Sequence, residues 1–270
     1  MAREFQFYIV PTPIGNLDDI TLRAIEVLKS VDLIACEDTR TTQKLLNHYD
    51  IKTKCFSYHK YNEKERVDYI LKEISEGKKI ALVSDAGTPM ICDPGEIILP
   101  ELIKNGITVT SLPGACAVTT FLSQVSRTNE EFSFIGFIPR TSKQIEEICK
   151  KHINTNMVFY DSPERIVKTL EVIKGFRGEI KVALGRELSK LFEEVVEGSI
   201  SEIINKFRDG IKGEIVCMVY ANEDNNSSSE MKLKISDLKA KGFKDKDISI
   251  ILSTLYGWNK NEVYKLSLTM

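Results

Sequence analysis

Residues 84–95, SDAGTPMICDPG, form the segment of this chain best suited to holding a small molecule. The segment follows an apolar run at 80–83, which predicts a buried strand that ends in a loop. Gly87 and Gly95 allow backbone angles that other residues avoid, and they let a ligand approach the main chain. Ligands of open α/β sheets bind beyond the carboxyl ends of the strands. The loop therefore predicts a small-molecule site read largely by backbone groups, with a tight structural turn as an equal alternative.

Two other segments place polar and aromatic side chains after short predicted strands. Residues 36–40 (CEDTR) hold two acids, a hydroxyl and a base, and a surface loop with a helix cap at Asp38 or Thr39 also explains them. Residues 57–63 (SYHKYNE) mix aromatic rings with a lysine and with His59, one of three histidines. A histidine can act as a general base, although a surface or capping role is the simpler interpretation.

Two motifs in the second half of the chain follow apolar runs in the same way. Residues 160–165 (YDSPER) end one predicted strand and begin a helix, where Pro163 suits the first turn and Ser162 the cap. Arg186 follows another strand, where a structural ion pair is as plausible as a place in a binding cleft. The six cysteines include no C-x-x-C spacing, which argues against a zinc or dithiol site.

The elements that position these motifs alternate between strand and helix in the first half of the chain. Strands are predicted at 4–11, 33–36, 54–57, 79–84 and 107–112, with helices at 20–31 and 62–76. This repeated order of strand, loop and helix predicts a mostly parallel sheet in an N-terminal α/β domain at 1–120.

The pattern changes after residue 126. Strands are predicted at 132–138, 157–160, 181–184, 193–197 and 214–220, with helices at 141–152, 163–174 and 201–208. Because the later strands follow one another closely, we expect a second α/β domain with a mixed sheet at 128–222. Residues 223–230, EDNNSSSE, are typical of a linker. A helix-turn-helix-like unit follows at 231–270, where Gly257 can end one helix and Asn259 or Asn261 can cap the next.

The composition of the 270 residues limits the class of protein. Hydrophobic residues make up 42% and the net charge is −2, so overall charge does not indicate a nucleic-acid partner. Residues 231–270 nevertheless hold eight lysines and four acids, a local charge of +4. No apolar run approaches the ~20 residues of a membrane span, and no signal peptide is visible. We expect a soluble, reduced, cytoplasmic protein that does not bind a membrane.

Seven segments, taken together and in order, resemble one known family. They are VPTPIGNLDDITLRA (10–24), ACEDTR (35–40), SYHKYNE (57–63), SDAGTPMICDPG (84–95), SLPGACA (111–117), FYDSPERI (159–166) and GREL (185–188). The chain closely resembles the bacterial ribosomal RNA small subunit methyltransferase I family, within the tetrapyrrole methylase superfamily. The resemblance covers essentially the whole chain, and seven ordered motifs are far more specific than any one of them.

The resemblance implies a fold and a reaction. The fold is two α/β domains of the tetrapyrrole methylase type with the cofactor in the cleft between them, followed by a small helical unit. The reaction is S-adenosylmethionine-dependent 2′-O-methylation of a cytidine ribose in the decoding centre of 16S rRNA, within the 30S subunit. A homodimer without a metal is also implied. Methyl transfer from a sulfonium depends chiefly on alignment of donor and acceptor, and it requires no metal.

The resemblance also implies which residues line the cofactor site. They are Pro13, Asp85, Ala86, Gly87, Thr88, Pro89, Ile91, Cys116, Ala117 and Tyr160. Related superfamily members have Gly-Asp-Pro where this chain has Gly87-Thr88-Pro89, so the role of the Thr88 side chain is open. Close packing of a helix against the sheet explains the small residues at 113–117 equally well.

Catalytic and RNA-contacting residues are implied on the same motifs. The catalytic candidates are His59, Glu37 and Arg186. The candidates for RNA contact are Asp38, Arg40, Tyr58, Lys60, Arg165, Lys241 and Lys244. Arginine and lysine can bind phosphates, carboxylates can hold a ribose hydroxyl, and aromatic rings can stack on unpaired bases. The resemblance does not identify a single general base.

Two other functions remain alternatives. The first is a methylase of small tetrapyrrole (precorrin-type) substrates, since the superfamily includes such enzymes. The second is a non-catalytic ribosome-assembly protein that kept the fold. The motifs at 36–40 and 57–63 and the basic tail favour RNA over a tetrapyrrole, and the complete cofactor-type loops argue against the loss of catalysis.

Overall fold

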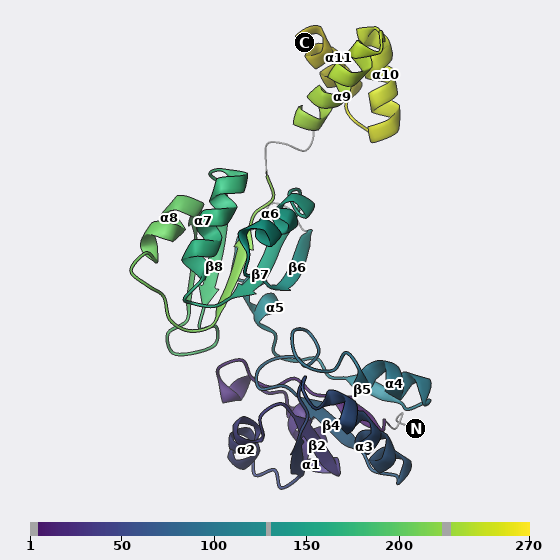
Figure 1. Cartoon of the computed structure of the whole chain (residues 1–270), viewed down its shortest axis with the longest axis vertical. Coiled ribbons are helices and arrows are strands. Elements are labelled where there is room, and N and C mark those ends of the chain that lie inside the picture. The colour runs from purple at the N-terminus through teal and green to yellow at the C-terminus, as the bar shows by residue number, and fades with distance from the viewer. Residues whose placement is uncertain (1–4, 128–130, 223–227) are drawn as a thin grey trace.

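A computed structural model describes residues 5–127, 131–222 and 228–270 (Figure 1). The first sheet has five parallel strands in the order β3-β2-β4-β1-β5. Its strands are β1 (Phe7–Ile9), β2 (Leu33–Cys36), β3 (Lys54–Ser57), β4 (Ile80–Val83) and β5 (Val109–Ser111). The parallel pairing agrees with the predicted alternation of strand and helix, and it brings the carboxyl ends of all five strands to one edge.

Helices cover both faces of this first sheet. They are α1 (Leu22–Ser30), α2 (Thr39–His48), α3 (Glu63–Ser75) and α4 (Ile98–Lys104), with a short 3-10 helix η1 (Leu17–Asp19) before α1. Leu28 of α1 and Leu46 of α2 pack on one face, whereas Ile70 of α3 and Leu102 of α4 pack on the other. Because both faces are covered, the four residues of β4 are all buried.

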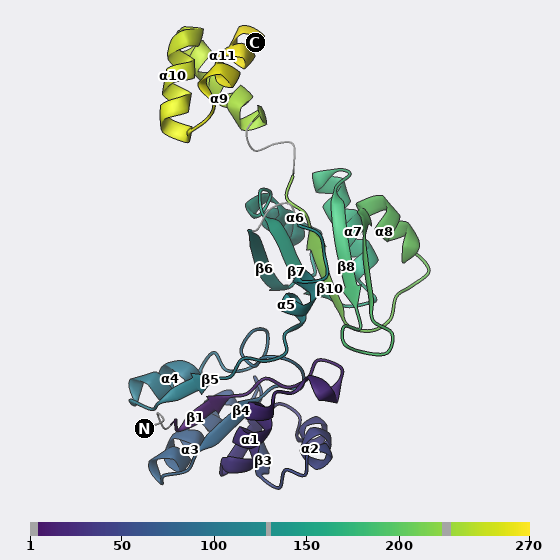
Figure 2. The same cartoon turned by 180° about the vertical axis from the view of Figure 1, so that it is seen from behind.

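The second sheet is mixed, with the order β6-β7-β10-β8-β9 (Figure 2). Its strands are β6 (Phe132–Phe137), β7 (Asn156–Asp161), β8 (Lys181–Arg186), β9 (Glu194–Ser199) and β10 (Ile215–Val219). Only β6 and β7 pair in parallel among these five. The helices α6 (Ser142–Lys151), α7 (Ile166–Arg177) and α8 (Ile200–Lys206) cover one face, and the short α5 (Ala117–Leu122) packs on the other.

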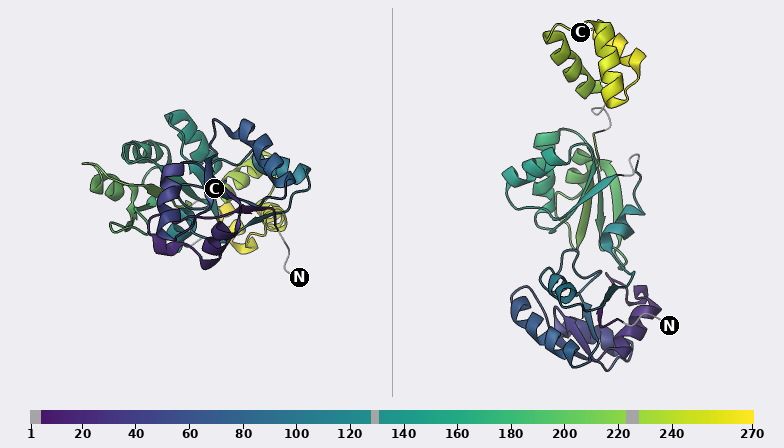
Figure 3. Two further views of the ribbon diagram at one scale, coloured as in Figure 1. Left: turned by 90° about the horizontal axis from the view of Figure 1, so that it is seen from below. Right: turned by 90° about the vertical axis from the view of Figure 1, so that its right-hand side faces the viewer.

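Three C-terminal helices form a unit with a core of its own (Figure 3). They are α9 (Ser228–Ala240), α10 (Asp245–Tyr256) and α11 (Lys260–Leu268). As predicted, α10 ends at Gly257, which has a left-handed φ of 67°, and Asn259 caps α11. The core of this unit comes from Met231, Ile235, Ile248, Leu252 and Val263.

Two local predictions are wrong. The helix expected at 163–174 begins only at Ile166, and Ser162 does not cap it, because a turn separates Ser162 from the helix. Of the linker expected at 223–230, residues 223–227 lie outside the described part of the chain, and α9 already begins at Ser228. The domain boundaries stay predictions, since membership of a sheet does not test independent folding. In the part of the chain that is described, no helix is long and apolar enough to cross a membrane.

Candidate active site

The loop after β4 is tied to the loop after β1. Thr12 and Gly87 exchange two backbone hydrogen bonds of 2.8 and 3.0 Å, and the Thr12 hydroxyl donates to the Ser84 carbonyl. Gly87 has a φ of +81°, and a Cβ there would lie 3.3 Å from a methyl group of Ile14. A side chain at position 87 would therefore strain the backbone and crowd Ile14. The parallel sheet thus gathers both loops at one edge and fixes their backbones.

Thr88 connects this loop to the segment that leads into α5. Its hydroxyl donates a 2.9 Å hydrogen bond to the carbonyl of Ala115. The next residue, Cys116, is the N-cap of α5, and Ala117 is the first residue of that helix. The Thr88 side chain therefore fixes the wall of small residues that follows β5.

The opposite wall comes from the second sheet. Tyr160 at the end of β7 lies within 5.5 Å of the Phe137 ring and 5.1 Å of the Phe134 ring, measured between ring centroids. Leu188, after β8, lies between Glu187 and Ser189, which both have left-handed φ angles. Val216 of β10 adds an apolar surface. The two sheets thus contribute facing sides of one cleft.

A cavity of about 440 Å³ occupies this cleft. That volume falls in the range of ~300–1,000 Å³ usual for small-molecule sites. From the first half of the chain the lining residues are Ile14, Asp85, Ala86, Gly87, Thr88, Ile91, Cys92, Asp93, Cys116 and Ala117. From the second half they are Phe137, Tyr160, Asp161, Ser162, Pro163, Leu188, Gly213, Glu214, Ile215 and Val216.

Most of the residues expected to contact the cofactor line this cavity. Eight of the ten do so: Asp85, Ala86, Gly87, Thr88, Ile91, Cys116, Ala117 and Tyr160. Pro13 and Pro89 do not line it, although each adjoins a residue that does. Whether any of the ten contacts a cofactor stays a prediction.

Carboxyl groups gather on the first-domain side of the cavity. Burial raises the pKa of Asp93, and the nearby charge of Asp85 raises it further. Burial raises the pKa of Asp85 as well. Glu37 belongs to the same group, since burial and the charges of Asp85 and Asp93 all raise its pKa, while Lys60 and His59 act in the opposite direction. Carboxyls with raised pKa values in a cleft are typical of sites that handle protons or cationic ligands.

The three catalytic candidates are not among the lining residues. Glu37 and His59 lie beside the carboxyl group just described, and the Nδ1 atom of His59 is buried without a hydrogen-bond partner. Arg186 lies elsewhere, at the end of β8, where its Nε donates to Glu194 at 2.8 Å. Arg186 therefore forms the structural ion pair that was expected from the sequence as the alternative to a place in the cleft.

Two of the residues expected to contact RNA instead form hydrogen bonds with other residues of the protein. The prediction for Tyr58 is wrong in this conformation: its ring is buried, and its hydroxyl donates to Glu63, so it cannot stack on a base. Tyr61, with 99% of its surface exposed, is the open aromatic residue of that motif. Arg165 donates to the carbonyls of Ile138 and Pro139, so it holds the loop after β6.

The remaining RNA candidates are accessible. Asp38 caps α2 and pairs with Arg40, whose guanidinium group is held at 2.7 Å from the carboxylate and still has a largely exposed side chain. That guanidinium group lowers the pKa of Asp38 to about 2. Lys60, Lys241 and Lys244 are exposed. Their contact with RNA stays a prediction.

Sequence reasoning missed several lining residues. Asp93 and Cys92 belong to the same loop as Asp85 and line the cavity. The sequence could have indicated them, because they are ionisable side chains in a glycine-containing loop that follows a buried strand. Nothing in the sequence indicated that Leu188 and Val216 line a site, because apolar residues in or beside a strand more often belong to the hydrophobic core. Among the described residues, no group of three or more histidine, cysteine or acidic side chains is arranged to hold a metal ion.

The fold and the cleft define a class of protein. A family model described as "Tetrapyrrole (Corrin/Porphyrin) Methylases" matches residues 6–204. Among solved structures, the chain is similar to a diphthine synthase, with a TM-score of 0.63 and 14% identity over 79% of this chain and 89% of that one. A cobalt precorrin-4 methyltransferase is similar as well, with a TM-score of 0.58 and 15% identity over 79% and 94%. These structures support the tetrapyrrole methylase fold.

Relatives in sequence narrow the class to one family. The chain is 39% identical to "Ribosomal RNA small subunit methyltransferase I" of Halalkalibacterium halodurans, over 96% of this chain and 93% of the relative. The proteins of the same name from Vibrio cholerae and Escherichia coli O157:H7 are 40% and 38% identical, each over 97% of this chain and over 93% and 94% of the relative. The chain belongs to the ribosomal RNA small subunit methyltransferase I family.

Membership of this family brings S-adenosylmethionine as the cofactor. The cavity fits such a molecule in three respects. Ala86, Gly87 and Ala117 leave room close to the main chain, while Tyr160 and neighbouring apolar side chains offer surface for an uncharged ring. Asp85 and Asp93 place negative charge near a ligand that carries positive charge.

Proposed function

We propose that this protein transfers the methyl group of S-adenosylmethionine to the 2′-hydroxyl of a cytidine ribose in the decoding centre of 16S rRNA. The observation that carries the proposal is the nearly full-length similarity to relatives named for small-subunit ribosomal RNA methylation. The cavity between the two sheets, with its walls of small and apolar residues, supports the cofactor part of the proposal. We further propose that the substrate is the 30S subunit in the cytoplasm and that the protein acts as a homodimer.

The residues around the cavity bind the cofactor and orient it toward the methyl acceptor. When bound, S-adenosylmethionine supplies an electrophilic methyl group on a sulfonium sulfur. The main chain at Ala86, the open space beside Gly87, the wall at Cys116 and Ala117, and the ring of Tyr160 bind and orient it. Much of the rate then comes from alignment with the acceptor hydroxyl.

Glu37 is our candidate for the group that receives the proton of the ribose hydroxyl. It lies at the end of β2, beside Asp85 and Asp93, and its raised pKa makes it a better proton acceptor than an ordinary carboxylate. His59 acts on the same cluster and is the second candidate. Arg40, Lys60 and Tyr61 are exposed on neighbouring motifs, where they can contact RNA phosphate or bases.

A methyl-transfer assay tests the proposal. Purified protein and S-adenosylmethionine with a tritiated methyl group are mixed with 30S subunits from cells that lack the native activity, and the site is mapped by reverse transcription sensitive to ribose methylation. Label at one cytidine ribose of the decoding centre is the expected result. Label in precorrin-type tetrapyrroles and none in 30S subunits would replace this proposal with a small-molecule methylase. Cofactor binding without label in either would contradict both.

A further inference from the structure

The helix α5 forms part of the cavity wall, but it is too short to be stable without contacts to the rest of the protein. It has six residues, Ala117–Leu122, which is less than two turns. Helices that short are not stable without packing. Cys116 and Ala117 at its beginning line the cavity, so any shift of the helix along the second sheet moves this wall. The contacts that fix α5 therefore also fix the cavity.

The C-terminal half of α5 is held by close packing against β8 and β10. Phe121 is fully buried there. A Cβ added to Gly185 of β8 would lie 2.7 Å from the Phe121 ring and 3.2 Å from a methyl group of Val216. Position 185 thus admits only glycine while Phe121 occupies this place, and the helix lies directly on the strands.

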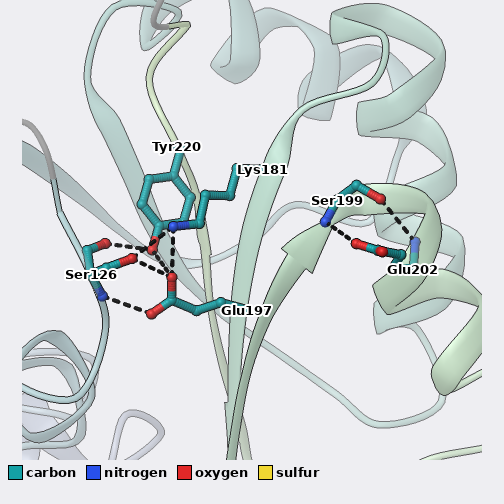
Figure 4. A network of polar contacts seen from close by, with 6 residues as sticks. All are labelled: Ser126, Lys181, Glu197, Ser199, Glu202 and Tyr220. Carbon is teal, nitrogen blue, oxygen red and sulfur yellow. Dashed lines mark hydrogen bonds and ion pairs between the residues drawn. The ribbon is translucent and has the colours of Figure 1, made fainter.

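The far end of the α5 segment is held by four residues, which we name the Glu197 network: Ser126, Lys181, Glu197 and Tyr220 (Figure 4). The Ser126 backbone N–H donates to Glu197 at 2.7 Å, and the Tyr220 hydroxyl donates to the Ser126 carbonyl. Lys181 donates to the Ser126 hydroxyl at 2.7 Å and pairs with Glu197 at 2.8 Å. The network joins the segment after α5 to β8, to β9 and to the end of β10.

The carboxylate of Glu197 is the centre of this network. Partial burial opposes its ionisation, but hydrogen bonds from Lys181, Ser126 and Tyr220 outweigh burial and lower its pKa to about 2. The Lys181 ammonium group also lies 4.5 Å from the centre of the Tyr220 ring. Glu197 is therefore charged at neutral pH and accepts bonds from three side chains and one backbone N–H, which fixes Ser126 in one place.

We propose that Glu197 is a positioning residue for cofactor binding. By holding Ser126 on the second sheet it anchors α5 at the end opposite Cys116 and Ala117, and so keeps these two residues in the wall of the cavity. Thr88 anchors the other side of the same segment through Ala115. The proposal depends on S-adenosylmethionine occupying the cavity, and it does not depend on the identity of the methyl acceptor.

The proposal is tested by measuring the dissociation constant of S-adenosylmethionine for the Glu197→Gln variant by titration calorimetry. We expect the dissociation constant to rise about tenfold, because the amide loses the charged bonds that fix Ser126. In turnover, KM for the cofactor should rise, while kcat at saturating cofactor stays within about twofold. Hydrogen exchange of the α5 amides should speed up in the free variant and slow again when the cofactor is added.

Glu202→Gln is the matched control. Glu202 also accepts a hydrogen bond from a backbone N–H, that of Ser199, at 2.7 Å (Figure 4). It serves the capping box of α8, which packs on the face of the second sheet opposite to α5. We expect this variant to lose thermal stability without a change in the dissociation constant or in exchange of α5. Equal weakening by both variants would trace the effect to general destabilisation and overturn the proposal.

Other outcomes also decide the question. A wild-type dissociation constant in Glu197→Gln, together with unchanged exchange of α5, would overturn the proposal. If Glu197→Gln does not fold, Tyr220→Phe replaces it, since that change removes only the hydroxyl that bonds to Ser126 and Glu197. We expect it to weaken cofactor binding about threefold, and no change would again overturn the proposal. Failure of the proposed function is distinct, because wild-type protein would then bind the cofactor yet leave rRNA unlabelled.

Discussion

Glu37 lies beside the cavity in a group of carboxyls that raises its pKa, first through burial and then through the charges of Asp85 and Asp93. A general base must be deprotonated to act. We therefore expect kcat/KM of the wild-type protein to rise with pH through this raised pKa and then to level off. Glu37→Gln should lose this limb of the pH profile and lower kcat/KM by about 10²–10⁴-fold.

The control for this prediction is His59→Gln. Both variants are measured by methyl transfer to 30S subunits between about pH 4.5 and 8, a range that covers carboxyl and histidine titrations. If the limb is lost in His59→Gln and kept in Glu37→Gln, the proton acceptor is His59.

We predict that stability and cofactor binding oppose each other at Asp93. Its folded pKa is raised by burial and by Asp85, so the folded protein holds this proton more tightly than the unfolded chain does. Stability is therefore lost as the pH rises through the raised pKa, and at neutral pH the charged carboxylate destabilises the fold. We expect Asp93→Asn to stabilise the protein by about 1 kcal/mol at pH 7. The same change should weaken cofactor binding.

Thermal unfolding at several pH values checks this prediction. The advantage of Asp93→Asn over wild type should shrink as the pH falls below the raised pKa, since the side chain is then neutral in both proteins. An advantage that is the same at every pH, or a destabilised variant at pH 7, would show that the charge of Asp93 does not oppose folding.

At the scale of elements, the hydrogen bond from the Thr88 hydroxyl to the Ala115 carbonyl joins two loops that no strand pairing connects. Thr88→Val keeps the shape of the side chain and removes this bond. We expect it to raise the dissociation constant of S-adenosylmethionine about fivefold, which corresponds to the ~1 kcal/mol usual for one hydrogen bond. Thr88→Ser keeps the hydroxyl and should bind like wild type. Equal binding by the Val and Ser variants would mean that the bond does not support the cavity.

At the scale of the whole molecule, the C-terminal helical unit carries exposed lysines away from the cavity. Lys241 and Lys244 lie in the turn between α9 and α10. If both bind RNA phosphates, replacing them with glutamine lowers the affinity for 30S subunits. It also reduces the slope of log K against log salt by about 1.4–1.8, at ~0.7–0.9 for each contact. Binding of S-adenosylmethionine should not change.

A filter-binding titration at several salt concentrations measures this slope. The matched control replaces Lys150 and Lys151, which are exposed at the end of α6 and carry the same charge. A tail variant with the wild-type slope, or a control variant with the larger effect, would move the RNA contact away from the C-terminal unit.

The sequence by itself determined which segments form the strands of both sheets and most of one wall of the cavity. Apolar runs such as 33–36 and 54–57 match β2 and β3 residue for residue, because short-range hydrophobic pattern and turn residues decide where a strand begins and ends. The loop at 84–95 was identifiable because its glycines and acids are contiguous and follow a buried strand. The alternation of elements also implied the parallel sheet.

Only the tertiary structure decided which distant side chains meet. Leu188 and Val216 line the cavity because the second sheet faces the first, and an apolar residue carries no signal for a site in its own sequence. Tyr58 is buried because its ring packs in the core with Phe7 of β1 and Leu102 of α4, although its motif suggested an exposed ring. The Glu197 network joins residues up to 94 positions apart. Such contacts depend on how strands pair and pack, which local periodicity does not specify.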